Sequence, residues 1–304
     1  MMNSFSDRLL DAIDKTGAPV CVGIDPVLEN LPPSVRQRVP AELTGTAAAV
    51  DCIYDFSLSV LKTVAGLAPI VKIQSGFFEK YLSDGIEAYH SLVRQARQLG
   101  LLVIGDVKRG DLSTTAVGYA QGHLADADAP DAITINPMLG MDSVAPFISA
   151  AAKAQKGLFV LVRTSNPGSA VLQDAKLADG RSWSELLADE LNKLACESEL
   201  IGRRGYSLVG AVVGATQPAA MKSLRARLPK SIFLLPGYGA QGATAEQTRD
   251  AFQNGHGAIV SASRSVIFAH AEPKYAEKFG GNWQKCVEQS LIDMKQDLNR
   301  VLGG

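Results

Sequence analysis

Short runs of apolar, often β-branched residues recur along the whole chain, and turn-forming residues flank each of them. A short, nearly continuous apolar run is typical of a strand that is buried on both faces of a parallel sheet. We therefore predict eight strands, at residues 20–25, 70–74, 102–108, 132–136, 158–164, 208–215, 232–236 and 258–264.

Segments with helical spacing separate these runs. Residues 84–99 repeat apolar side chains on one helical face, and so do residues 182–200, where Ser182 and Glu185 have the spacing of a capping box. Alternating strands and helices indicate right-handed βαβ units, and eight such units over this length predict a closed (β/α)8 TIM barrel. An open, doubly wound sheet is the main alternative, although six strands would suit it better than eight.

No linker interrupts the pattern, so we expect one barrel domain over residues 1–304. A helix at about residues 5–15 should precede the first strand, and helices at about 272–302 should close the domain. The long connections 27–45 and 165–181 follow the first and fifth strands. In a barrel both would lie at the C-terminal rim, where active sites are built.

Composition excludes several classes of protein. The 304 residues are 46% hydrophobic and 20% charged, and the net charge of −1 provides no field that would attract nucleic acid or an anionic membrane. The four cysteines form no CxxC motif, which favours a reducing compartment. Charged residues interrupt the apolar residues near the N-terminus, so this segment does not match a signal peptide. No apolar stretch reaches the ~20 residues that a membrane span needs. We therefore expect a cytoplasmic protein without nucleic-acid or membrane partners.

Polar residues end most of the predicted strands at their C-terminal side. Asp-Pro and Asn-Pro turns explain two of them singly, but turns do not explain so many at one mouth of a barrel. The residues are Asp25, Lys72, Asp106, Lys108, Asn136, Thr164, Ser165 and Arg264.

The segment 105–111 carries the strongest signal. Asp106 and Lys108 are two residues apart on a strand and should point the same way, Asp111 follows one turn later, and Lys72 can join them from the adjacent strand. Two lysines and two aspartates would then alternate. A structural ion network is the other interpretation, but dehydrating several charges together is costly, and such clusters are more typical of functional sites.

Residues 237–242 match GxGxxG, a dinucleotide-binding pattern. The next predicted strand lacks the acidic residue that this pattern needs and ends instead at Arg264. An arginine there could bind the 2′-phosphate of NADP, so this point alone does not exclude an NADP site. The barrel explains the motif better, because the loops after strands seven and eight commonly bind phosphate. Glycine amides, a short helix at Ser265 and the Arg264 guanidinium would hold it. The four histidines are scattered without ligand spacing, so we expect no metal site.

Together these residues resemble a known family. The pattern Asp106-x-Lys108-x-x-Asp111, preceded by Asp25 and Lys72 and followed by the loop 236–241 and Arg264, resembles orotidine 5′-phosphate decarboxylase. Residues 72–79, 106–116 and 136–142 resemble its longer bacterial subgroup. The resemblance runs from about residue 20 to 270. Ile73 departs from it, since the subgroup carries proline there.

The resemblance implies a TIM-barrel homodimer with shared active sites that needs no metal or cofactor. Lys108 would donate a proton to C6 of the pyrimidine, with Asp106 beside the leaving carboxylate. The other implied roles are Lys72 and Asp111 in the charged network, Asp111 and Thr115 in the partner's site, Asp25 on ribose hydroxyls, Ser165 on the pyrimidine, and Gln241 and Arg264 on phosphate, with Thr164 and Pro236 nearby.

This chemistry suits the residues. Loss of CO2 from C6 leaves charge in an sp2 orbital that no carbonyl can delocalise, and a fixed ammonium can stabilise and then protonate that carbanion. One alternative is a metal-dependent sugar-phosphate decarboxylase or aldolase on the same barrel, which would need an acidic ligand in place of Lys72. The other is a non-catalytic phosphoribosyl-ligand binding protein.

Overall fold

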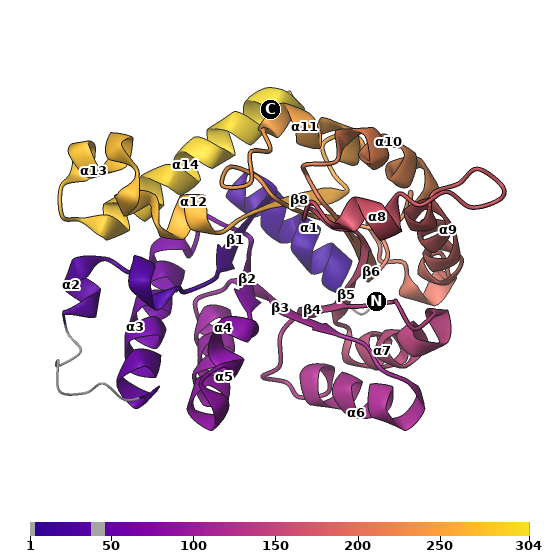
Figure 1. Cartoon of the computed structure of the whole chain (residues 1–304), viewed down its shortest axis with the longest axis horizontal. Helices are drawn as coiled ribbons and strands as arrows, with labels where there is room; N and C mark the ends of the chain where they lie inside the picture. Colours follow the sequence, from indigo (N-terminus) through magenta and orange to yellow (C-terminus); the bar gives the residue numbers. More distant parts are fainter. Residues whose placement is uncertain (1–3, 38–45, 304) are drawn as a thin grey trace.

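Eight parallel strands close into a barrel in chain order, from β1 to β8 and back to β1 (Figure 1). The computed structural model describes residues 4–37 and 46–303. The closed barrel confirms the predicted (β/α)8 TIM fold and excludes the open sheet. The strands are β1 (Val20–Ile24), β2 (Ile70–Gln74), β3 (Leu102–Arg109), β4 (Ala132–Ile135), β5 (Gly157–Arg163), β6 (Val209–Val213), β7 (Phe233–Pro236) and β8 (Ala258–Ala262).

Helices surround the strands and supply the outer layer of the barrel (Figure 1). The longer ones are α1 (Phe5–Thr16), α3 (Thr46–Val64), α5 (Leu82–Gln98), α6 (Ser113–Leu124), α7 (Met141–Ala154), α9 (Trp183–Ala195), α10 (Pro218–Arg227), α13 (Pro273–Phe279) and α14 (Trp283–Leu302). Shorter ones are α2 (Pro33–Arg36), α4 (Gly76–Glu79), α8 (Ser169–Gln173), α11 (Ala245–Thr248) and α12 (Arg264–Ile267). Within the described part of the chain, no helix is both long and apolar enough to cross a membrane.

The helix predicted at 182–200 is shorter in the structure. It begins with the expected capping box of Ser182 and Glu185 but ends at Ala195, and a separate 3-10 turn covers Ser198–Leu200. The rim connection 27–45 contains a 3-10 turn and α2, and its residues 38–45 lie outside the described residues.

Helix α1 closes the N-terminal end of the barrel. Its buried residues Phe5 and Leu9 join the apolar cluster that fills the inside of the strands. The Phe5 ring packs edge-on against Phe159, with 6.0 Å between ring centroids. Gly157 is required beside it, because a Cβ atom at that position would lie 2.1 Å from the Phe5 ring. With this end filled, the C-terminal mouth is the face left to hold a site.

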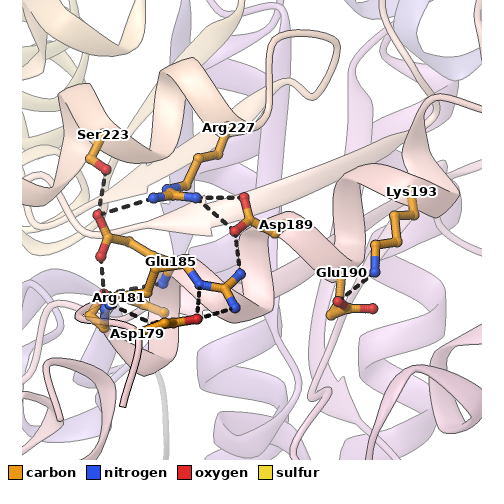
Figure 2. Close-up of polar contacts among 10 residues, drawn as sticks. Asp179, Arg181, Glu185, Asp189, Glu190, Lys193, Ser223 and Arg227 are labelled. Carbon is orange, nitrogen blue, oxygen red and sulfur yellow. Dashed lines mark hydrogen bonds and ion pairs between the residues drawn. The ribbon is translucent and has the colours of Figure 1, made fainter. Parts of the chain in front are cut away.

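Polar contacts fasten the long connection after β5 to the outer helices (Figure 2). Glu185 accepts hydrogen bonds from the Ser182 amide at 2.7 Å and from the Ser223 hydroxyl of α10 at 2.6 Å. Asp189 accepts from Arg227 of α10 at 2.7 Å and from Arg181, at the end of the connection, also at 2.7 Å. These contacts join α9 to α10 and fix the far end of the connection whose near end enters the site.

Candidate active site

A cavity of about 720 Å³ lies over the C-terminal ends of the strands. Its apolar floor is the top of the barrel core, formed by Leu161, Val212 and Leu234. Most of the predicted site residues line its walls: Asp25, Lys72, Asp106, Lys108, Thr164, Ser165, Pro236, Gln241 and Arg264. Of the eight polar residues predicted at strand ends, seven line this cavity, and Asn136 does not.

Asp106 is the centre of the charged cluster in this pocket. Its Oδ2 atom accepts a hydrogen bond from the Lys72 Nζ at 2.7 Å, and its Oδ1 atom accepts one from the Lys108 Nζ at 2.6 Å. The Lys72 ammonium also lies 3.8 Å from an Asp25 carboxylate oxygen. Lys72 and Asp106 are buried, whereas the Lys108 side chain is 45% exposed.

The two buried groups keep each other charged. Burial alone would raise the pKa of Asp106, but the Lys72 and Lys108 charges outweigh it and hold that pKa far below its usual range. Burial likewise opposes the charge on Lys72, but Asp106 and Asp25 raise its pKa above the ordinary lysine value. Lys72 and Asp106 therefore both remain charged at neutral pH.

A bulge in β3 points Lys108 toward the cavity. The pairing of β3 with β4 shifts register between Gly105 and Arg109. Within the bulge Lys108 has φ 45°, a left-handed conformation that non-glycine residues seldom adopt. Such strain is concentrated at functional sites, where the surrounding structure sustains it.

Two residues of the cluster were missed by the sequence analysis. The Gln74 Nε2 donates to Asp106 Oδ2 at 3.0 Å, and the Thr134 hydroxyl donates to Asp106 Oδ1 at 2.8 Å. Gln74 lies two residues after Lys72 and so shares its face of β2, which is a signal that the sequence carried. Thr134 is the polar residue of an otherwise apolar strand β4.

The far end of the cavity is suited to an anion. The loop after β7 turns through Gly237 and Gly239, with φ 111° and 71°, and the Tyr238 hydroxyl fastens it to Asp297 of α14 at 2.7 Å. Gln241 and Arg264 line the cavity here, and neither pairs with a carboxylate among the described residues. Because this glycine-rich loop follows the seventh strand of a barrel, it is no dinucleotide fingerprint.

Arg163 organises the wall that carries Ser165, and the sequence analysis missed this role as well. Its side chain is 1% exposed, and it pairs with Asp174 at 2.9 Å and donates to the Thr164 carbonyl at 2.8 Å. The Gln173 side chain accepts from the Thr164 amide at 2.8 Å. These contacts hold Thr164 and Ser165 at the cavity wall.

Asp111 and Thr115 are not among the residues that line this cavity. The chain leaves β3 at Arg109, and Asp111 accepts a hydrogen bond from the neighbouring Leu112 amide at 2.7 Å. Within one chain the charged residues of the cluster are therefore Lys72, Asp106, Lys108 and Asp25. Asp111, which we predicted beside Lys108, does not join them in its own chain.

No group of three or more His, Cys, Asp or Glu side chains among residues 4–37 and 46–303 is arranged to hold a metal. At the mouth itself, the Lys72 ammonium occupies the space between Asp25 and Asp106. A cation fixed between these two carboxylates opposes binding of Mg²⁺ there.

A closed barrel with a charged cluster at its C-terminal mouth is typical of a TIM-barrel enzyme. The model of the orotidine 5′-phosphate decarboxylase / HUMPS family matches residues 18–279. The chain belongs to this family.

Curated relatives extend the similarity over nearly the whole chain. Orotidine 5′-phosphate decarboxylase of Rhodopirellula baltica is 40% identical over 308 residues, covering 98% of this chain and 99% of the relative. The protein of the same name from Caldicellulosiruptor bescii is 38% identical over 312 residues, covering 99% and 100%. Among solved structures, OMP decarboxylase of Leishmania donovani superposes with a TM-score of 0.75 at 27% identity, covering 99% of this chain and all of that one.

Proposed function

We propose that the cluster at the barrel mouth decarboxylates orotidine 5′-phosphate to uridine 5′-phosphate and CO2. The chain is a carbon–carbon lyase of de novo pyrimidine biosynthesis, in keeping with its family and its curated relatives. The observation that carries the proposed mechanism is the Lys108 ammonium, held 2.6 Å from Asp106 at the edge of a cavity that ends at Arg264.

In this mechanism the bond between C6 and the carboxylate breaks, CO2 leaves, and the electron pair stays on C6. The Lys108 ammonium stabilises this developing charge and then transfers a proton to C6. Asp106 holds the Lys108 ammonium in place beside the leaving carboxylate. Lys72 compensates the charge of Asp106, so the cluster is organised before substrate arrives.

The remaining cavity residues bind the rest of the substrate. Asp25 lines the cavity beside Lys72, and its carboxylate can accept hydrogen bonds from the ribose hydroxyls. Ser165 contacts the pyrimidine from the β5 wall. Gln241 and Arg264 bind the phosphate, and Pro236 shapes the wall beside them. Phosphate binding is remote from C6, and its energy can hold the substrate against the cluster.

The metal-dependent sugar-phosphate decarboxylase or aldolase is the alternative that a simple assay separates. Because Lys72 stands between the two carboxylates, turnover should need no divalent ion. Purified protein is assayed for loss of orotidine 5′-phosphate with and without EDTA. Unchanged turnover in EDTA is expected, whereas activity abolished by EDTA and restored by Mg²⁺ favours the alternative.

We also propose a homodimer with shared active sites, acting in the cytoplasm as one domain per chain. Asp111 and Thr115 do not line their own chain's cavity. The segments that follow β3 and β4 carry exposed apolar side chains, all at least 40% exposed: Leu112, Val117, Tyr119, Met138 and Leu139. Exposed apolar patches of this kind mark interaction sites, and a twofold contact there would bring Asp111 and Thr115 to the partner's cluster.

Mixing inactive variants tests the shared site. Lys108→Ala and Asp111→Ala homodimers should each be severely impaired. After subunit exchange, the site on the Asp111→Ala chain keeps its own Lys108 and receives Asp111 from its partner. Random exchange makes half the dimers mixed, so about a quarter of all sites should recover. Verified exchange without recovered activity contradicts sharing and leaves the reaction itself standing.

A further inference from the structure

We propose that Thr134 of β4 is a positioning residue for the reaction, because its hydroxyl joins the backbone of Lys108 to the carboxylate of Asp106. This inference rests on the proposed roles of Lys108 and Asp106. The Lys108 amide donates to Thr134 Oγ1 at 3.0 Å, and Thr134 Oγ1 donates to Asp106 Oδ1 at 2.8 Å.

The need for this hydroxyl begins with the bulge in β3. Gly105 pairs with Ile133 and Arg109 pairs with Ile135, so residues 106–108 of β3 face Thr134 alone on β4. The bulge takes the Lys108 amide out of the regular ladder of backbone hydrogen bonds. A partly buried amide that leaves the ladder still needs an acceptor, and the Thr134 side chain supplies it.

The two hydrogen bonds fix the direction of the hydroxyl proton. A threonine hydroxyl has one hydrogen to donate, and here its oxygen already accepts from the Lys108 amide. Its hydrogen is therefore directed at Asp106 Oδ1, the same oxygen that accepts from the Lys108 ammonium at 2.6 Å. The main chain of Lys108, the hydroxyl, the carboxylate and the ammonium of Lys108 thus form a closed ring of contacts.

This ring holds both ends of the lysine. Lys108 has φ 45°, a conformation that a lysine backbone disfavours, so surrounding contacts must hold it there. Half of its side chain is exposed and could adopt other rotamers. Thr134 restrains the backbone and orients the carboxylate that binds the ammonium, which keeps Nζ at the cavity, beside the position proposed for C6 of the substrate.

Packing alone does not account for a threonine here. Thr134 is 1% exposed, and the other residues of β4 are Ala132, Ile133 and Ile135. Valine has the same shape and would suit a buried strand better, since it carries no hydroxyl to dehydrate. If Thr134 only filled space, replacing it by valine would leave turnover intact.

The test compares Thr134→Val, which removes the hydroxyl and keeps the shape, with Thr134→Ser, which keeps the hydroxyl. We expect the valine variant to lose on the order of 10- to 100-fold in kcat, the scale of a misplaced catalytic group. KM should change by less than about threefold, because Thr134 acts on the reacting end and the phosphate contacts remain. The serine variant should retain kcat within about threefold.

A control removes a buried threonine hydroxyl elsewhere. Thr248 is fully buried, donates to the Ala245 carbonyl at 2.7 Å and does not line the cavity. Thr248→Val should keep a normal kcat per active site, with sites counted by titration with uridine 5′-phosphate. If it loses kcat as much as Thr134→Val does, the effect of Thr134 is one of general stability and the proposal is overturned.

Normal kcat in a folded Thr134→Val protein also overturns it. If the valine variant does not fold, Thr134→Ala takes its place: loss of kcat in alanine but not in serine supports the proposal, and equal kcat in both contradicts it. Lys108→Ala, assayed alongside, separates the two levels of inference. If Lys108→Ala retains turnover, the proposed mechanism fails; if it is inactive while Thr134→Val is normal, only the role of Thr134 fails.

Discussion

Lys72 holds the charged cluster together, and its removal should cost stability as well as activity. Lys72→Met keeps much of the side-chain volume and removes the charge. Asp106, which is 6% exposed, then retains Lys108, Gln74 and Thr134 as donors but loses the buried ammonium at 2.7 Å. Asp25 loses its cationic neighbour at 3.8 Å.

The size of the effect follows from the burial and from the remaining donors. Removing one partner of a buried ion pair costs about 3–5 kcal/mol, because the other charge is left uncompensated. Three donors still reach Asp106, so we expect the lower end, roughly 3 kcal/mol in the free energy of unfolding. A second substitution, Asp106→Asn, removes the stranded charge. The double variant should therefore recover a large part of the loss that Lys72→Met causes alone.

The dependence on pH has a definite sign. The pKa of Asp106 is lowered in the native protein, so the carboxylate contributes stability above its ordinary pKa that is lost as pH falls through the native value. Without Lys72, burial is less opposed and this pKa must rise. The buried anion can then be neutralised at higher pH, so the difference in stability between wild type and Lys72→Met should shrink from pH 7.5 to pH 5.

Urea unfolding followed by circular dichroism measures these free energies, at one fixed protein concentration because any subunit association adds to stability. Wild type, the two single variants and the double variant form a complete cycle. Equal stability of Lys72→Met and wild type at pH 7.5 would refute the reasoning. So would a double variant that is less stable than Lys72→Met, because the stranded charge would then not be the cause.

Two further predictions concern the phosphate end and the thiols. Arg264→Ala should weaken the binding of orotidine 5′-phosphate by about 1.5–3 kcal/mol, the contribution of a charge-assisted hydrogen bond, and should barely affect binding of the phosphate-free nucleoside. Equal losses of binding for both compounds would show that Arg264 acts elsewhere. A thiol reagent should modify Cys196 rapidly in the native protein, because it is the exposed cysteine while Cys52 and Cys286 are buried and burial raises the pKa of Cys21 to about 12. Rapid reaction of more than one thiol per chain in the native protein would contradict the burial of the other cysteines.

The fold was largely readable from the sequence because it depends on patterns that local residues carry. Continuous apolar runs marked the strands, and polar residues marked the C-terminal ends of most of them. In a closed barrel those ends meet at one mouth, so Asp25, Lys72, Asp106 and Arg264 could be assembled without coordinates.

Other features depend on contacts between distant segments, which one sequence does not display. The bulge that turns Lys108 inward has no local signature, since its partner is a single threonine 26 residues further along. Arg163 lies near the end of a predicted strand, and nothing in the neighbouring sequence indicates that it binds the loop after that strand. The predicted group of two lysines and two aspartates placed Asp111 with Lys108, but the turn after β3 carries Asp111 away from it within one chain.

The proposed reaction depends most directly on Lys108. Steady-state decarboxylation of orotidine 5′-phosphate by wild type and Lys108→Ala, in buffer containing EDTA, is the measurement that tests it. We predict that the variant loses nearly all turnover, because both the charge that stabilises the carbanion and the proton donor are gone, while it still binds uridine 5′-phosphate and unfolds cooperatively. A folded Lys108→Ala protein with near-normal kcat would contradict the mechanism.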